Sequence, residues 1–290
     1  TAVGFKSLFA ATTGGDNTAV GELALAAMTD ATENVAVGRC ALAGNTTSGG
    51  NTAVGFRALT TQVAGGAANT AVGHNALTAN STGDCNTAVG HAASDSNTTG
   101  SSNTSVGKNA LFTNLGGDQN VAVGTDAMLS NTTGESNVGI GKNALCLNTT
   151  ASGNTAVGTY SVRDTTTGCY NTGIGYSALR VNSTGDQNVA VGRESLDHNT
   201  TADNNTAVGY KSLFTNTTGT NLVAIGENAL AASTTASNNT AVGVAALDST
   251  TTGAGNSGVG VSALTANTTG ANNAAVGKDS GGTNTTGSGN

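Results

Sequence analysis

Histidine is the residue in this sequence best suited to chemistry, and only three histidines occur. His74 and His91 are 17 residues apart, so a repeat of that length would stack their imidazole rings, which could weakly bind a metal ion. Zinc needs three or four ligands, and no cysteine or carboxylate adjoins the two histidines at that spacing. His198 follows Asp197, but successive residues of a strand point apart. Nothing resembles a nucleophile beside a base, so we predict no enzyme, catalytic residue, metal site or cofactor.

The four cysteines do not form a recognisable pattern. Cys40, Cys85, Cys146 and Cys169 fall at four different places within the repeat described below. A disulfide framework or a zinc site would need pairs at matched spacings. We interpret them as scattered small residues.

Asn-x-Ser/Thr triplets are acceptors for N-glycosylation when they lie on accessible loops. Ten of them open at one position of the repeat, and the candidate acceptors are Asn45, Asn80, Asn97, Asn131, Asn148, Asn182, Asn199, Asn216, Asn267 and Asn284. Stacked coils would place these acceptors in a row along one edge. Asn-Thr-Thr-Gly is also good turn chemistry, because asparagine can bond its own backbone and glycine adopts a positive φ. A glycosylated edge and a simple turn remain open as alternatives.

A repeat of 17 residues positions all of these side chains. The glycine of each Val-Gly or Ile-Gly step recurs at that interval from Gly4 to Gly277, with a single interval of 18 between Gly55 and Gly73. Seventeen repeats account for the 290 residues, so we predict one continuous repeat domain over 1–290. The extra residue falls within 62–66, a glycine-rich turn in which an insertion costs little. Positions are numbered within a repeat so that Thr1 is position 1 and Asn17 is position 17.

Each repeat is expected to form one coil of a parallel β-solenoid. Thr/Val-Ala-Val at positions 1–3 alternates as a strand does, and positions 7–9 around leucine are expected to form a second short strand. Clusters of glycine, asparagine and threonine supply the turns, and 43 glycines disfavour helix. The predicted fold class is all-β: 17 coils of 17 residues, one single-residue insertion and two short strands per coil.

Stacking would place identical positions above one another at about 4.8 Å. Valine at position 3 and leucine at position 8 are expected to form apolar columns, and asparagine at position 17 a ladder of side-chain amides. The predicted ladder comprises Asn17, Asn34, Asn51, Asn69, Asn86, Asn103, Asn120, Asn137, Asn154, Asn171, Asn188, Asn205, Asn239, Asn256, Asn273 and Asn290. Charged residues occur only at positions 5, 6, 9, 10, 13, 15 and 16, which predicts that these positions face water and most of the others face inward.

Small and aromatic residues leave further alternatives open. Positions 2, 4 and 7 are almost entirely Ala, Gly or Ser, either because the coil is narrow or because another chain approaches closely. Aromatic residues fall mostly at positions 5 and 9, which also hold charges. We expect these rings to be partly exposed, covering the edges of the core or contacting sugars or a neighbouring rod.

Composition limits the classes of partner that this chain is expected to bind. The net charge is −7 and the ten basic residues are spread along the chain, which argues against nucleic acid. No apolar run reaches membrane-spanning length, so we expect no membrane insertion. Joining Asn290 to Thr1 would continue the repeat in register. Copies are therefore expected to stack head to tail, or the residues form a window of a longer fibre.

The phrase Asn-Thr-Ala-Val-Gly followed by Ala-Leu, as at 51–55 with Ala58 and Leu59, has relatives in the other repeats and resembles the head repeats of trimeric autotransporter adhesins. It also resembles Asn-Thr-Ala-Val-Gly repeat regions in tail-fibre-like proteins of phages and bacteria. The resemblance implies a left-handed parallel β-roll, surface exposure and a lateral homotrimer. The longer Asn-Thr-Thr-Gly turn is a departure from the adhesin repeat.

We predict a structural protein that forms an extracellular or cell- or virion-surface fibre by axial stacking of coils. The alternative is an adhesin or tail-fibre-like rod whose exposed positions contact a host or a glycan. A binding tip would need a local break from the repeat and none is visible, which favours the structural interpretation. Rows of threonine at positions 12 and 13 make ice binding a minor alternative.

Overall fold

The computed structural model describes residues 1–63 and 65–290. These residues form two compact units, Thr1–Thr150 and Ala151–Asn290, and each unit is described by itself. Ala64, within the insertion predicted at 62–66, lies outside the described residues. The described part of the chain holds no helix with the length and apolar character needed to cross a membrane.

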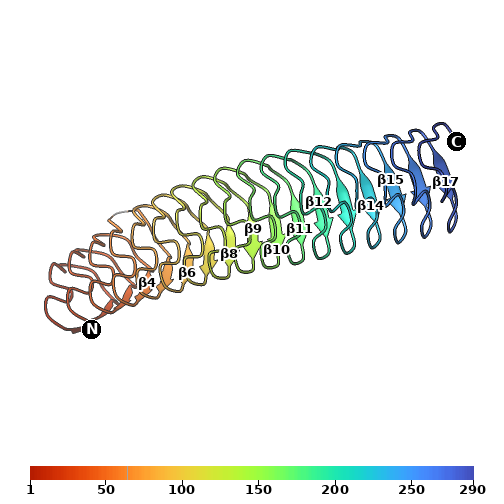
Figure 1. Ribbon diagram of the computed structural model, residues 1–290. Coiled ribbons are helices and arrows are strands. Elements are labelled where there is room, and N and C mark those ends of the chain that lie inside the picture. Colours follow the sequence, from red (N-terminus) through yellow and green to blue (C-terminus); the bar gives the residue numbers. More distant parts are fainter. Residues whose placement is uncertain (64) are drawn as a thin grey trace. The chain divides into compact units, whose positions relative to one another are not determined.

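Each unit is a stack of coils with one short strand per coil (Figure 1). The strands of the first unit are β1 (Ala2–Val3), β2 (Thr18–Val20), β3 (Val35–Val37), β4 (Thr52–Val54), β5 (Thr70–Val72), β6 (Thr87–Val89), β7 (Thr104–Val106), β8 (Val121–Val123) and β9 (Val138–Ile140). The strands of the second unit are β10 (Thr155–Val157), β11 (Thr172–Ile174), β12 (Val189–Val191), β13 (Thr206–Val208), β14 (Val223–Ile225), β15 (Thr240–Val242), β16 (Ser257–Val259) and β17 (Ala274–Val276). Neighbouring strands within a unit are parallel and in register, as in the pairing of Thr104 with Val121. The prediction of an all-β parallel β-solenoid is confirmed.

The prediction of two strands per coil is wrong, because positions 7–9 lie in a turn. Residues at positions 6 and 8 adopt left-handed backbone, as in Asn109 (φ 54°) and Leu111 (φ 54°), and a strand cannot contain such residues. A non-glycine residue in this region costs roughly 1–2 kcal/mol. The turn is held by the next coil, since the Leu111 N–H donates to the Ala127 carbonyl at 2.9 Å.

The core of each coil consists of position 2 and positions 7 and 8. Ala122, Ala127 and Leu145 are fully buried, and the same holds for their counterparts in most coils. Valine at position 3, predicted to be a core column, is instead exposed or half-buried: Val106 is 37% and Ile174 41% accessible, and Val208 is half-buried. Position 2 faces inward, so positions 1 and 3 must face outward, because side chains of a strand alternate. The narrow interior therefore explains the alanines at positions 2 and 7.

Glycine at position 4 is required for two separate reasons. Gly124 has a φ of 132°, which side chains rarely adopt, and a Cβ there would lie 2.7 Å from the Gly141 carbonyl oxygen of the next coil. Both the turn and the close stacking of coils therefore exclude any other residue.

Position 8 of one coil packs against position 2 of the next, and a change from leucine at position 8 coincides with a change from alanine at position 2, although Leu247 also meets a glycine, Gly258. Leucine normally meets alanine, but Met128 meets Gly139 and Val162 meets Gly173, and a Cβ on either glycine would lie within 2.9 Å of the larger side chain. Where position 8 is Ser94, position 2 is Ser105, and their hydroxyls hydrogen-bond at 2.8 Å. Adjacent coils are thus matched in volume and polarity.

Candidate functional site

The predicted histidine pair does stack. His74 and His91 have ring centroids 5.1 Å apart and planes tilted by 4°, and Phe56 continues the row at 5.1 Å from His74. Within residues 1–63 and 65–290 no three His, Cys, Asp or Glu side chains come together as metal ligands would. The row therefore consists of stacked rings at position 5. The four cysteines form no disulfide within the described residues, and Cys146 is buried whereas Cys85 is exposed.

The asparagines at position 17 form a buried column. Asn103 accepts the backbone N–H of Asn120 at 2.9 Å through its Oδ1, and its Nδ2 donates to the Gly117 carbonyl at 2.8 Å. Direct amide-to-amide bonds, the contact expected from the sequence, occur in only some coils and are longer, as from Asn137 to Asn120 at 3.2 Å. Each side chain therefore joins one coil to the backbone of the next.

The asparagines at position 11 form a second buried column, in agreement with the absence of charge at this position but not with an accessible row of acceptors. The Asn97 Nδ2 donates to the Asn80 Oδ1 at 2.8 Å and to the Gly100 carbonyl at 2.9 Å. Both of its N–H groups are thereby used. The Gly100 carbonyl also accepts the Asn86 Nδ2 at 2.8 Å, so this one oxygen links the two asparagine columns.

Burial at position 11 argues against the glycosylation hypothesis. Nine of the ten candidate acceptors are at most 1% exposed: Asn45, Asn80, Asn97, Asn131, Asn148, Asn182, Asn199, Asn216 and Asn267. Asn284 is half-buried and makes the same two contacts at 3.2 and 3.1 Å. A glycan is attached through this amide nitrogen on an accessible loop. The folded coil gives it no access at the nine buried positions, which favours the turn interpretation.

Threonine at position 12 is also occupied by the solenoid. The hydroxyl of Thr132 donates to the Thr149 carbonyl at 2.9 Å, and Thr98 makes the equivalent bond to Leu115 at 2.6 Å. These hydroxyls hold the turn to the next coil. The ice-binding alternative then rests on the threonines at position 13, such as Thr99 and Thr133, which are exposed.

The exposed residues at position 3 form an uninterrupted apolar column in each unit. The position-3 column consists of Val3, Val20, Val37, Val54, Val72, Val89, Val106, Val123 and Ile140 in the first unit and Val157, Ile174, Val191, Val208, Ile225, Val242, Val259 and Val276 in the second. Its members carry no charge although they face water. Large exposed apolar patches typically mark interaction sites.

A groove with a volume of about 420 Å³ lies on the second unit, between the turns that follow β10 to β13. We call it the tyrosine–arginine groove, and it is lined by Tyr160, Arg163, Tyr176, Ser177, Arg180, Glu194, Asp197, His198 and Phe214. Its residues come from positions 5 and 6, just after the position-4 glycine, and from positions 9 and 10, just after the core residue at position 8. Two columns of turn residues thus form its two walls.

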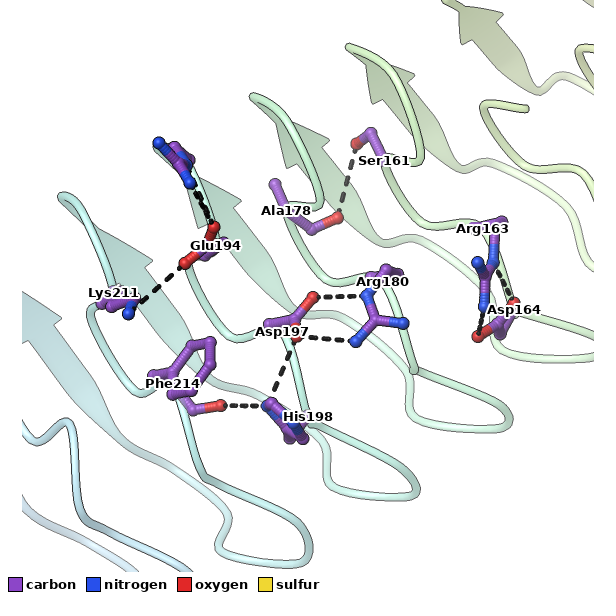
Figure 2. Close-up of polar contacts among 11 residues, drawn as sticks. Ser161, Arg163, Asp164, Ala178, Arg180, Glu194, Asp197, His198, Lys211 and Phe214 are labelled. Carbon is purple, nitrogen blue, oxygen red and sulfur yellow. Dashed lines mark hydrogen bonds and ion pairs between the residues drawn. The ribbon is translucent and has the colours of Figure 1, made fainter. Parts of the chain in front are cut away.

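Two ion pairs lie along the groove (Figure 2). Arg180 binds Asp197 of the next coil through Nε at 2.9 Å and Nη2 at 3.0 Å, and the Asp197 side chain is only 5% exposed. The hydrogen bond to Asp197 raises the pKa of Arg180, so the guanidinium stays charged. Arg163 makes the same two-pronged contact with Asp164 at 2.6 and 2.8 Å.

Aromatic rings line both sides of the groove. Tyr160 and Tyr176 meet edge to face at 6.0 Å on one side, and His198 and Phe214 meet at 4.7 Å on the other. The His198 Nδ1 lies 3.0 Å from the Phe214 carbonyl and 3.4 Å from Asp197 Oδ2, which fixes the imidazole ring (Figure 2). The sequence carried one signal for this site, because all four tyrosines lie between 160 and 210. This clustering of tyrosines was not considered when the repeat was judged to have no local break.

A scan against protein-family models finds no match to this chain, and searches of curated proteins and of solved structures find none either.

Proposed function

We propose that this chain is a structural protein, a segment of an extracellular or surface fibre that grows by axial stacking of coils and associates sideways with copies of itself. The observation that carries the proposal is the position-3 column. It is apolar in every repeat and is exposed in most of them, at 37% for Val106 and 41% for Ile225, and half-buried in the others. A surface kept free of charge over so many repeats is typical of an interface.

Axial growth is supported by the bonds between coils. The Gly21 N–H donates to the Val3 carbonyl at 2.8 Å, and the Gly260 N–H makes the same bond to Val242 at 2.8 Å. A further coil of the same sequence would find the same donors and acceptors. Head-to-tail contacts of this kind do not close on themselves, so they produce filaments.

Lateral association is supported by the match in spacing. The column presents one Val or Ile per coil at about 4.8 Å, the distance between neighbouring strands. Another copy of this chain offers the same spacing and the same absence of charge, and so it can cover the column along its length. The resemblance to adhesin head repeats favours a homotrimer and a surface location.

The test uses the 290-residue chain, measured by sedimentation velocity and imaged by electron microscopy. We expect a defined oligomer in solution and filaments at higher concentration. Replacing Val106 and Val208 by lysine, one in each unit, is expected to yield monomers because each lysine would be buried unpaired at the interface.

The matched control replaces Thr133 and Thr218 by lysine. Both residues are exposed turn residues at position 13, where charge already occurs in the repeat. The control should assemble as the unaltered chain does. A chain that sediments as a monomer at every concentration would contradict lateral association, and rods without filaments would contradict axial stacking.

A further inference from the structure

We propose that the tyrosine–arginine groove is a binding site for a neutral oligosaccharide built of pyranose rings. The groove is independent of the proposed fibre, because it uses positions 5, 6, 9 and 10 and not the position-3 column. It gives one stretch of an otherwise uniform solenoid a ligand of its own.

The first argument is a serine hydroxyl that borders the groove. Ser177 is 5% exposed as a residue and lines the groove. Its hydroxyl can serve a ligand hydroxyl as donor or as acceptor.

The second argument is the ion pair on the groove wall. Arg180 uses Nε and Nη2 to bind Asp197, which leaves its Nη1 donors for a ligand. Arg180 and the Ser177 hydroxyl together offer a donor and an acceptor on the lining of one groove, as the hydroxyls of a sugar require. The charges are already neutralised within the pair, so the site does not call for a charged ligand.

The third argument is the aromatic lining. Tyr176 is 49% exposed at the rim, and Tyr160 and Phe214 line the groove with it. The apolar faces of pyranose rings pack on such rings, while their hydroxyls bond to the polar groups between them. A pocket with apolar walls and a few placed polar groups is the usual form of a small-ligand site.

The test measures binding of maltotetraose, cellotetraose and chitotetraose to the 290-residue chain by saturation-transfer NMR and calorimetry. We expect at least one of them to bind. Tyr176→Ala should weaken that binding about tenfold or more, and Ser177→Ala by a smaller factor, since tenfold corresponds to about 1.4 kcal/mol.

The matched control is Phe112→Ala, which removes a ring at position 9, as in Phe214, but from a coil of the first unit outside the groove. The control should bind with unchanged affinity. Failure of all three sugars to bind, or binding that survives both groove variants, would overturn the proposal. Neither result would bear on assembly, which sedimentation measures separately.

Discussion

Gly173→Ala tests the matched packing between coils. An alanine Cβ at this position would lie 2.5 Å from the Val162 Cγ2 and 2.7 Å from the Ser161 Oγ, closer than ordinary van der Waals contact. Val162 cannot readily move aside, because a β-branched side chain is stiff at χ1. The Ser161 hydroxyl, which donates to the Gly173 carbonyl at 2.8 Å, would also be disturbed.

The expected magnitude follows from two opposing effects. Alanine in a strand is favoured over glycine by roughly 0.5–1 kcal/mol. Overpacking a tight interior costs about 1–3 kcal/mol, so the clash should prevail with a net loss of about 1–2 kcal/mol. Urea unfolding followed by circular dichroism should show a lower midpoint, and the melting temperature should fall by about 2–4 °C for each kcal/mol.

Two further variants make this prediction refutable. Adding Val162→Leu to Gly173→Ala restores the common leucine–alanine pair and should recover most of the loss, because contacting residues couple energetically. Gly258→Ala is the matched control: its Cβ would lie 3.1 Å from the Leu247 Cγ, a contact that the repeat tolerates elsewhere. A Gly173→Ala chain as stable as the unaltered one, or a double variant without recovery, would refute the matched-packing explanation.

Three more predictions concern titration and the asparagine columns. Burial raises the pKa of Asp248, so folding takes up a proton between the unfolded and folded pKa, and the ionised carboxylate opposes folding at higher pH. Asp248→Asn should therefore raise the free energy of unfolding above that interval and leave it unchanged below the unfolded pKa, in urea titrations at several pH values. Asn97→Ala should cost about 1–3 kcal/mol because buried partners lose their hydrogen bonds, whereas exposed Thr99→Ala should cost little in the same assay. Mass spectrometry of peptides containing Asn97 should find it unmodified, and full occupancy by a glycan would contradict its buried place in the column.

Periodicity in the sequence was sufficient to predict the stack of coils. An interval of 17 residues that repeats throughout the chain leaves little alternative to one coil per repeat, and invariant glycine at position 4 marks where coils approach closely. Charge placement correctly assigned several positions to the interior, including 8, 11, 14 and 17. It could not distinguish a buried position from an exposed apolar one, and so it misplaced the valines of position 3.

Tertiary structure decided which face of the strand points inward. Thr-Ala-Val is compatible with either face being buried, and only the narrow space between the strand and the turn at positions 6–8 selects alanine. The same close stacking buries Asn97 and its counterparts, which were candidate surface acceptors, in a column. Each amide nitrogen donates to the asparagine of the previous coil and to a carbonyl three residues on, as Asn97 does to Asn80 and Gly100. The groove likewise exists only in three dimensions, since Tyr160, Tyr176 and Asp197 come from three successive coils that stacking places side by side. The sequence by itself determined the period and the stack, and the width of the coil determined what faces water.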